Sequence, residues 1–266
     1  MLLPICFIVD KNVYMHLETV CKSIIKTLSI PYHFCVLTDS NDTAANVLSL
    51  LKSFCDDKCI NVKSLSIADV EYLNSLYVQE ARSDITGFGY AQLLICNYFS
   101  EYKKILFMEP DQIVQFDLAL FWNEMYEKNI WLAAVNYNNG GHTLATLHKL
   151  YHEGKVFKTC AFNCGVVVYD TEFWIDNNLG NLCFDAVMKQ KETNGTYYNY
   201  YAEGAMNVAL QNYFYELEQK YNFCDLGWNP TIPKSYLDTA VILHWNGLHK
   251  PWKHDGYYRE YYATRP

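Results

Sequence analysis

The sequence predicts an α/β fold, in which strands and helices alternate along the chain. Apolar runs of strand length alternate with segments whose apolar residues recur at helical spacing. Hydrophobic residues make up 51% of the 266 positions, which is enough to bury a full core. No linker rich in glycine, serine or proline and no internal repeat divides the chain, so we expect a single domain over residues 1–266.

The first hundred residues predict a βαβ opening that continues into further alternation. Residues 5–9 and 34–37 are short apolar runs that are typical of buried strands. Between them, helical spacing relates six apolar residues: Leu17, Val20, Cys21, Ile24, Ile25 and Leu28. The other elements that we expect are helices over residues 44–54 and 89–99 and strands over residues 60–65, 104–108 and 240–243.

Two carboxylates follow the strand expected at residues 104–108, with one residue between them. Glu109 and Asp111 flank Pro110. Oxygen ligands at that spacing suit magnesium or manganese, which bridge phosphate oxygens. Taken alone, a proline flanked by acids is ordinarily a solvated turn.

A second motif, residues 244–252, reads His-Trp-Asn-Gly-Leu-His-Lys-Pro-Trp and follows the strand expected at residues 240–243. His244 would lie at the strand end, where α/β sheets bind ligands, and an added imidazole favours manganese over magnesium. Gly247 would let the backbone approach a phosphate, and Lys250 would supply a mobile positive charge. The alternative is a surface turn that ends at a proline.

Together with two further segments, these motifs resemble the retaining glycosyltransferase family 8, which contains glycogenin and bacterial lipooligosaccharide galactosyltransferases. The four matching segments are residues 7–12, 109–111, 162–169 and 244–252, in the order of the family. The resemblance implies the glycosyltransferase A fold, a Rossmann-like nucleotide-sugar-binding sandwich with a mixed sheet flanked by helices.

The resemblance also implies a role for individual residues. The expected metal ligands are Glu109, Asp111 and His244. The residues expected to contact the nucleotide, the diphosphate or the donor sugar are Ile8, Asp10, Asn12, Pro110, Asn163, Cys164, Gly165, Gly247 and Lys250. Glu203 and Lys250 are the expected catalytic residues, with Glu203 facing the sugar and Lys250 stabilising the leaving group.

The implied function is a metal-dependent retaining transfer of a hexose from a UDP-sugar to an acceptor hydroxyl. The cation would be Mn²⁺, with Mg²⁺ as the alternative. The acceptor would be a saccharide, a protein or a small molecule, and neither the acceptor nor the sugar can be read from the sequence.

Several positions depart from the family pattern. Glu109 stands in place of an aspartate, and Gln92 occupies a position that is commonly basic. Ala202 replaces an acid, and Glu203 replaces an amide on the reactive side of the sugar. The changes at Gln92 and Ala202 leave open an alternative, a catalytically impaired sugar-nucleotide-binding protein. Lys234 stands where glycogenin has its acceptor tyrosine, which excludes self-glycosylation at that site.

Charge and composition narrow the range of partners. A formal net charge of -8 and the absence of a basic run argue against nucleic acid. No signal peptide and no apolar run long enough to span a membrane is apparent, so we expect a cytoplasmic protein. The 10 cysteines lie mostly in apolar runs and are expected to be reduced core residues.

The remaining segments have weaker signals. Residues 136–159 have the composition of a loop, and the irregular spacing of its histidines, His142, His148 and His152, predicts exposed side chains rather than a metal site. The tyrosine-rich residues 197–201 and 257–262 are candidates for stacking an acceptor sugar. Packing of the tyrosines at the surface or in a homodimer contact is the alternative.

Overall fold

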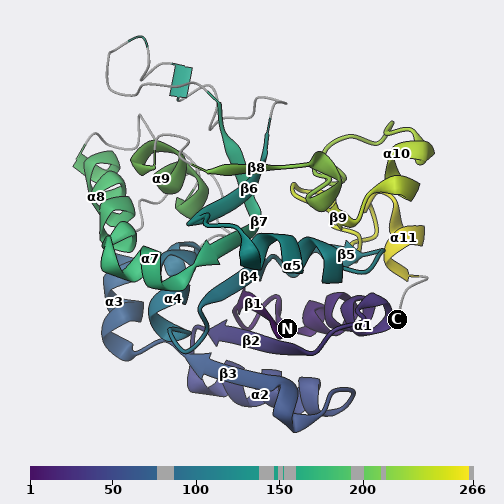
Figure 1. The fold of residues 1–266 in the computed structure, drawn as a ribbon, viewed down its shortest axis with the longest axis horizontal. Helices are drawn as coiled ribbons and strands as arrows, with labels where there is room; N and C mark the ends of the chain where they lie inside the picture. Colours follow the sequence, from purple (N-terminus) through teal and green to yellow (C-terminus); the bar gives the residue numbers. More distant parts are fainter. Residues whose placement is uncertain are drawn as a thin grey trace.

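The structure, a computed structural model, describes residues 1–76, 87–137, 147–148, 152, 160–192, 201–210 and 214–263. Within these residues, seven strands form one sheet in the order β3-β2-β1-β4-β7-β6-β8 (Figure 1). From one edge to the other, the strands are Ile60–Ser64 (β3), Tyr32–Thr38 (β2), Leu3–Val9 (β1), Lys104–Met108 (β4), Phe162–Asp170 (β7), Leu132–Asn136 (β6) and Tyr215–Leu217 (β8). A small second sheet pairs Gln112–Val114 (β5) with Ile242–His244 (β9).

The large sheet is mixed, as the family resemblance implies. β3, β2, β1 and β4 run parallel, whereas β7 is antiparallel to both β4 and β6. The chain builds outward from β1 to β2 and β3 and then returns to β4 on the other side of β1. The carboxyl ends of β1 and β4 therefore lie at a topological switch point, the usual place for a ligand in such sheets.

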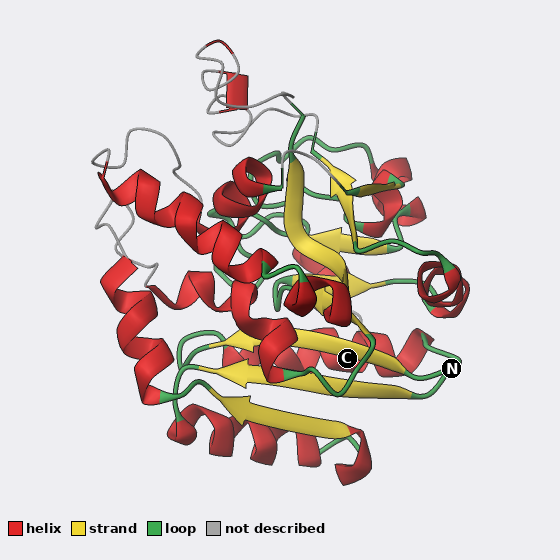
Figure 2. Cartoon of the chain, turned by 60° about the vertical axis from the view of Figure 1, so that its left-hand side comes forward, coloured by secondary structure: helices red, strands yellow, loops and turns green. Residues whose placement is uncertain are grey.

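Helices cover both faces of the sheet (Figure 2). One core cluster contains residues of three helices: Leu17–Thr27 (α1), Asn41–Lys52 (α2) and Ala119–Glu127 (α5). The cluster on the other face contains residues of six helices: Ile67–Leu76 (α3), the 3₁₀ helix Gly87–Leu94 (η3), Ile95–Tyr98 (α4), Thr171–Asp176 (α7), Leu179–Glu192 (α8) and Tyr201–Ala209 (α9). Alternation along β1 explains the two layers, because Ile5 and Phe7 join the first cluster and Cys6 joins the second.

A third apolar cluster covers the small sheet. It joins β5 and β9 to Lys234–Thr239 (α10) and Arg259–Ala263 (α11). Tyr258 and Tyr261 belong to this packing: the Tyr258 hydroxyl accepts from the Ile232 amide at 2.6 Å, and the Tyr261 hydroxyl donates to Asp238 at 2.6 Å. The packing of these tyrosines supports the alternative of surface packing over a stacking platform. Residues 197–200 lie outside the described residues.

Three differences between the predicted and the observed element boundaries have a local cause. The helix expected over residues 89–99 is mostly 3₁₀ helix, because η3 is buried nearly all round between α3, α8 and α9 rather than along one face. The helix expected from residue 44 begins at Asn41, where the Ser40 side chain accepts from the Thr43 amide at 3.2 Å. The last strand starts at Ile242 because Ala240 ends α10.

The sequence predicts reduced cysteines in the core and exposed histidines in residues 136–159. No disulfide is present among the cysteines, and six of them are buried: Cys6, Cys21, Cys35, Cys96, Cys164 and Cys183. His148 and His152 are exposed as predicted, whereas His142 and most of residues 136–159 lie outside the described residues. Within the described part of the chain, no helix has the length and apolar character needed to cross a membrane.

Candidate active site

The ends of three strands bring the predicted metal ligands together. Glu109 and Asp111 follow β4, directly at the switch point beside β1. His244 ends β9, and the antiparallel pairing of β5 with β9 places it opposite Gln112. The Trp245 amide donates to the Asp111 carbonyl at 3.0 Å, which fixes this register beside the carboxylates. Residues more than a hundred positions apart are thus joined by a three-residue strand pair.

The three side chains form a compact cluster of potential ligand atoms. His244 Nε2 lies 2.8 Å from Glu109 Oε2 and 3.4 Å from Asp111 Oδ1, and one ligand atom of each residue lies within 4.8 Å of the others. His244 is 0% exposed and Asp111 is 5% exposed, whereas the Glu109 side chain is 37% exposed. Within the described residues, this is the one cluster of at least three such side chains.

His244 Nε2 is a buried nitrogen without a hydrogen bond among the described residues. The 2.8 Å separation from Glu109 is an ion-pair distance but lacks the alignment of a hydrogen bond. A buried imidazole nitrogen that faces two carboxylates in this way fits a divalent cation, because each group supplies a ligand atom suited to Mn²⁺.

Lys250 lies against this cluster rather than in open solvent. Its ammonium donates to Asp111 Oδ2, in a short contact, and to the Trp245 carbonyl at 2.9 Å. Burial by itself raises the pKa of Asp111, but the charges of Lys250 and then His244 outweigh it and hold the pKa of Asp111 well below its usual range. The sequence motif did not predict this pairing of Lys250 with Asp111.

The pKa of His244 is shifted in the opposite direction from that of Asp111. Burial lowers the pKa of its imidazole, but the neighbouring Asp111 carboxylate, followed by Cys224, raises that pKa well above its usual value. In the absence of a cation, a proton on His244 therefore compensates the negative charge of the cluster. A cation that binds there must displace this proton.

Gly165 makes room for the cluster. The antiparallel pairing of β4 with β7 continues beyond Met108, so that the Glu109 amide donates to the Gly165 carbonyl at 3.1 Å. A Cβ atom on Gly165 would lie 2.3 Å from His244 Cε1 and 2.8 Å from Glu109 Oε2. Only glycine fits at this position without displacing a predicted ligand.

The backbone conformation of Gly247 and its contact with Trp228 both favour glycine at this position. Its φ of +122° lies in a region that L side chains rarely adopt, and a Cβ atom would lie 2.6 Å from Trp228 Nε1. The turn after β9 is also held from the side of β1, because the Trp252 ring stacks on His16 at a centroid distance of 3.7 Å. Trp252 therefore packs against the protein, as expected for a surface turn. His244 and Lys250 of the same motif lie beside the carboxylates of Glu109 and Asp111.

The residues predicted to face the donor sugar form a second group beside Gly165. Asn163 Nδ2 donates to Glu203 Oε2 at 3.0 Å, and the Cys164 amide donates to the same oxygen at 3.4 Å. Glu203 lies in the first turn of α9, where the helix dipole also favours an acid. The structure therefore brings Asn163, Cys164, Gly165 and Glu203 together at one end of β7.

The residues predicted to contact the nucleotide lie at the carboxyl end of β1. Asp10 Oδ1 accepts from the amides of Asn12 at 2.8 Å and Val13 at 3.2 Å, and Asn12 Nδ2 donates to Asp10 Oδ2 at 3.1 Å. Asp10 and Asn12 line a cavity of about 220 Å³ together with seven other residues: Lys11, Asp39, Leu65, Val70, Leu73, Asn74 and Phe88. Ile8, half-buried in β1, packs against the core below, and Pro110 is half-buried between the two carboxylates.

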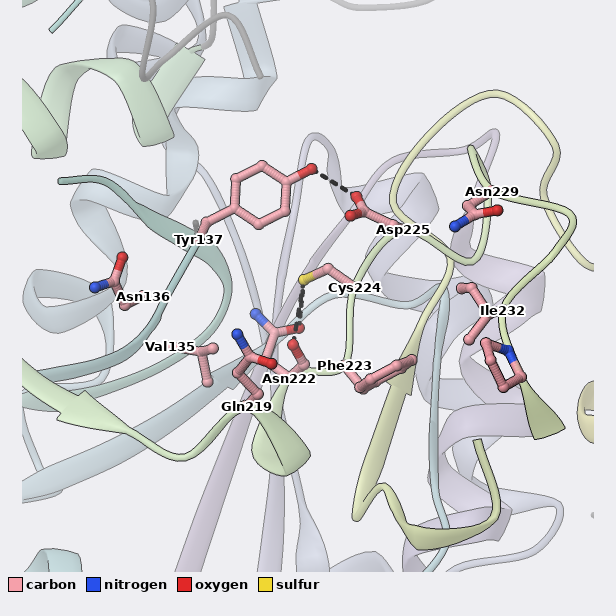
Figure 3. A pocket seen from close by; sticks show the side chains of 11 residues that line it. Val135, Asn136, Tyr137, Gln219, Asn222, Phe223, Cys224, Asp225, Asn229 and Ile232 are labelled. Carbon is pink, nitrogen blue, oxygen red and sulfur yellow. Dashed lines mark hydrogen bonds between the residues drawn. The ribbon is translucent and has the colours of Figure 1, made fainter. Parts of the chain in front are cut away.

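The sequence analysis did not identify several residues near the site. Asp39 follows β2 at the same sheet edge as Asp10, a position that strand-end reasoning could have identified. Asn222 and Cys224 lie behind His244, whose Nδ1 is 2.9 Å from Asn222 Oδ1 and 3.6 Å from Cys224 Sγ. They line a second cavity of about 220 Å³, across which Tyr137 donates to Asp225 (Figure 3). No spacing pattern distinguishes these residues.

Gln92, the residue that departs from the basic pattern of the family, is buried rather than turned to a donor. Its Nε2 donates to the Cys164 carbonyl at 3.0 Å and to the Tyr169 hydroxyl at 3.0 Å. It therefore supports β7 from within the core. Ala202 is also buried in the same core cluster.

Comparison with known proteins decides the family. A sequence profile described as "Glycosyl transferase family 8" matches residues 4–256, nearly the whole chain. The chain belongs to glycosyltransferase family 8. Relatives from the family include "Glycosyltransferase 8 domain-containing protein 2" of Mus musculus, which is 26% identical over 178 residues, 57% of this chain and 50% of the relative. This family 8 chain therefore aligns with about half the length of that relative.

A plant relative and several solved structures extend the comparison. "Probable galacturonosyltransferase 4" of Arabidopsis thaliana is 24% identical over 163 residues, 58% of this chain and 25% of the relative. A solved structure of the galactosyltransferase LgtC with donor and acceptor sugar analogs has a TM-score of 0.73 at 18% identity and covers 98% of this chain and 94% of that chain. GlyE of Streptococcus pneumoniae has a TM-score of 0.68 at 18% identity, covering 99% and 60%. These likenesses confirm the glycosyltransferase A fold of this family 8 chain.

Proposed function

We propose that this family 8 chain is a metal-dependent retaining glycosyltransferase that moves a hexose from a UDP-sugar to an acceptor hydroxyl. The observation that carries the proposal is the convergence of Glu109, Asp111 and His244 at the switch point of a nucleotide-sugar-binding fold. The names of two similar proteins, a galactosyltransferase and a probable galacturonosyltransferase, support a hexose-derived donor. The profile match over residues 4–256 supports one glycosyltransferase domain over residues 1–266.

Glu109, Asp111 and His244 are the residues that would hold the cation. When bound, the cation supplies positive charge that neutralises the diphosphate, and its preferred identity is Mn²⁺ because an imidazole joins two carboxylates. The protein needs that charge at the site, since its net charge is -8.

Lys250 and Gly247 would bind the diphosphate. In the structure, the ammonium of Lys250 is held by Asp111. Asp111 would share its negative charge with a bound cation, so Lys250 would be held less tightly and would turn toward the diphosphate of the donor. There it would stabilise the negative charge that develops on UDP as the C1–O bond breaks.

The remaining predicted contacts divide between the two ends of the donor. Asp10 and Asn12 would position uridine and ribose in the cavity at the end of β1, beside Ile8 and Pro110. Asn163, Cys164 and Gly165 would lie along the sugar. Glu203 would face the anomeric carbon, where its carboxylate either attacks C1 to form a covalent intermediate or stabilises positive charge at that carbon. The acceptor oxygen bonds to C1 on the face that UDP leaves, and its proton passes to a phosphate oxygen of the departing UDP.

The alternative of an impaired sugar-nucleotide-binding protein depends on Gln92 and Ala202. Both side chains are buried in the core, where Gln92 has two hydrogen bonds and Ala202 packs against neighbouring apolar residues. Because neither side chain is exposed at the proposed donor site, we do not favour this alternative.

Release of UDP tests the proposal directly. The protein is incubated with UDP-glucose, UDP-galactose or UDP-galacturonic acid and Mn²⁺, with and without sugar acceptors, and UDP is measured. We expect release from at least one donor, its loss in EDTA and its loss in the Asp111→Asn variant. UDP-sugar binding without any release from these donors would support the binding protein, and release unaffected by EDTA would exclude the metal site.

A further inference from the structure

The Nδ1 side of His244 faces a buried chain of polar side chains. Nδ1 lies 2.9 Å from Asn222 Oδ1, and Asn222 is 2% exposed. Asn222 Nδ2 in turn donates to Asn163 Oδ1 at 2.8 Å. Asn163 Nδ2 donates to Glu203 Oε2 at 3.0 Å. Two amides thus connect the predicted metal ligand His244 with the predicted catalytic carboxylate Glu203.

One backbone amide determines which way both side-chain amides point. The Gly165 N–H can only donate, and it lies 2.9 Å from Asn163, so the group that faces it is the oxygen, Oδ1. Asn222 must then present its NH₂ group to that oxygen. The carboxylate of Glu203 can only accept, which requires the NH₂ group of Asn163 on that side. The orientation of the pair is therefore set at both ends.

The orientation of Asn222 also determines which ring nitrogen of His244 carries a proton. With its NH₂ group turned to Asn163, Asn222 presents its oxygen to Nδ1, so Nδ1 must carry a proton. In the neutral imidazole, Nε2 is then unprotonated and its lone pair faces Glu109 and Asp111. Cys224 is the competing neighbour of Nδ1, but its sulfur is 3.6 Å away and is a weaker partner.

Backbone pairing holds Asn222 in place. Asn222 follows the 3₁₀ helix Gln219–Tyr221 (η4). The next residue, Phe223, donates its amide to the Ile242 carbonyl at 2.9 Å and accepts at its carbonyl from the His244 amide at 3.0 Å. These two bonds fix the segment of Asn222 alongside β9, independently of the side chains.

We propose that Asn222 is a positioning residue that selects the metal-binding tautomer of His244 and, through Asn163, couples the metal centre to Glu203. The inference rests on the proposed metal-dependent function. The affinity for the cation would then depend on the side-chain oxygen of Asn222. The NH₂ group of Asn222 would hold Asn163 in place by donating to its Oδ1.

Replacement of each half of the amide separates these two roles. The Asn222→Leu variant keeps the approximate size of the side chain but lacks an acceptor, and we expect Mn²⁺ affinity to fall by about 10- to 100-fold. The Asn222→Asp variant keeps an oxygen toward Nδ1, so we expect an affinity close to wild type but a lower stability of the metal-free protein. Electron paramagnetic resonance measures free Mn²⁺, and chemical unfolding in EDTA measures the stability.

The Cys224→Ala variant is the matched control, because it removes the other neighbour of Nδ1 and should leave Mn²⁺ affinity nearly unchanged. Equal losses in Asn222→Leu and Asn222→Asp, or none in Asn222→Leu, would overturn the inference while leaving the metal centre in place. Absence of Mn²⁺ binding by the wild type would overturn the proposed metal centre, and the inference with it.

A measurement on folded wild-type protein avoids any effect of the substitutions on folding. In protein labelled with [¹⁵N]histidine and carrying one equivalent of diamagnetic Zn²⁺, NMR should show His244 protonated at Nδ1. Its signal, one of eight from histidine, is the one that is missing from the spectrum of the His244→Gln variant. An unprotonated Nδ1 would contradict the proposed role of Asn222.

Discussion

At position 165 the chain has room for a hydrogen atom and nothing larger, because a Cβ atom there would overlap both His244 and Glu109. The sequence predicts some of the residues packed around Gly165 but not others. Glu109, Asp111 and His244 lie in short motifs at strand ends, so the sequence predicts them as ligands and the structure brings them together. Asn222 has no such pattern, because a single amide behind an imidazole leaves no spacing in the sequence.

Lys250 offers the first test at this scale. The Lys250→Ala variant should lower kcat by about 100-fold and change KM much less, because the charge on the leaving UDP is greater in the transition state than in the bound donor. Steady-state kinetics with the active UDP-sugar measures both constants. Lys253, an exposed neighbour that donates to the Leu248 carbonyl at 3.2 Å, provides the control variant Lys253→Ala. A raised KM at unchanged kcat would assign Lys250 to substrate anchoring alone.

Glu203 offers the second test. In Glu203→Gln a side-chain oxygen still accepts from Asn163, so we expect folding and UDP binding to persist. Turnover should fall by about 100-fold, because the negative charge near the anomeric carbon is lost. Calorimetry with UDP and turnover assays provide the two measurements. Near-normal turnover would exclude an obligatory nucleophile, whereas a collapse would justify a search by mass spectrometry for a trapped adduct in the wild type.

At the scale of elements, periodicity predicted the strands and helices that have one buried face. α1 illustrates this, since its buried residues include Leu17, Val20, Cys21 and Ile24, four of the six residues with helical spacing. Periodicity failed where tertiary packing dominates. η3 is enclosed by other elements, and α3 has a weak pattern with two fully buried residues, Leu73 and Leu76. The pairing of β5 with β9 was also out of reach, because the apolar run before His244 predicts a strand but not its partner, and the three residues of β5 have no sequence signal of their own.

The start of α2 provides a test at this scale. The Ser40→Ala variant should lower the free energy of unfolding by about 1 kcal/mol, because the Thr43 amide loses its side-chain acceptor. The Ser40→Asn variant keeps an acceptor and should retain most of the stability. Urea unfolding followed by circular dichroism measures the difference. Equal stability of all three proteins would show that the cap contributes nothing.

At the scale of the whole molecule, the excess of acidic over basic residues makes the site dependent on positive charge. The formal net charge is -8, and Asp111 is paired with Lys250 and His244 in the absence of a cation. The family and the fold followed from the motifs, which lie at the ends of the sheet strands. The assembled electrostatics did not, because they depend on residues far apart in the sequence.

This charge balance predicts how metal binding varies with pH. The pKa of His244 is raised, so below that pKa each cation that binds must displace one proton. Mn²⁺ affinity should therefore increase with pH, by at most about tenfold per unit, and level off above the pKa of His244. The raised pKa stabilises the metal-free fold most at low pH, so the stabilisation by Mn²⁺ should grow as pH rises.

Thermal unfolding with and without Mn²⁺ between pH 6 and 8 checks this prediction. At a free concentration of 100 times Kd, the cation should add about 2.7 kcal/mol to the free energy of unfolding. The Asp111→Asn variant should show little of this increment. A stabilisation independent of pH would mean that His244 is not a ligand.

The pairing of β5 with β9 has a consequence for the order in which the protein is assembled during translation. The ribosome synthesises Asp111 long before His244 and Lys250, so the nascent chain carries an acidic pair without its cationic neighbours. Contacts of such large sequence separation form late in folding. The large sheet can begin to form from its parallel half, whereas the proposed metal site would be complete only when the final strand has arrived. Binding of Mn²⁺ to nascent chains is therefore expected only after synthesis has passed the motif that follows β9.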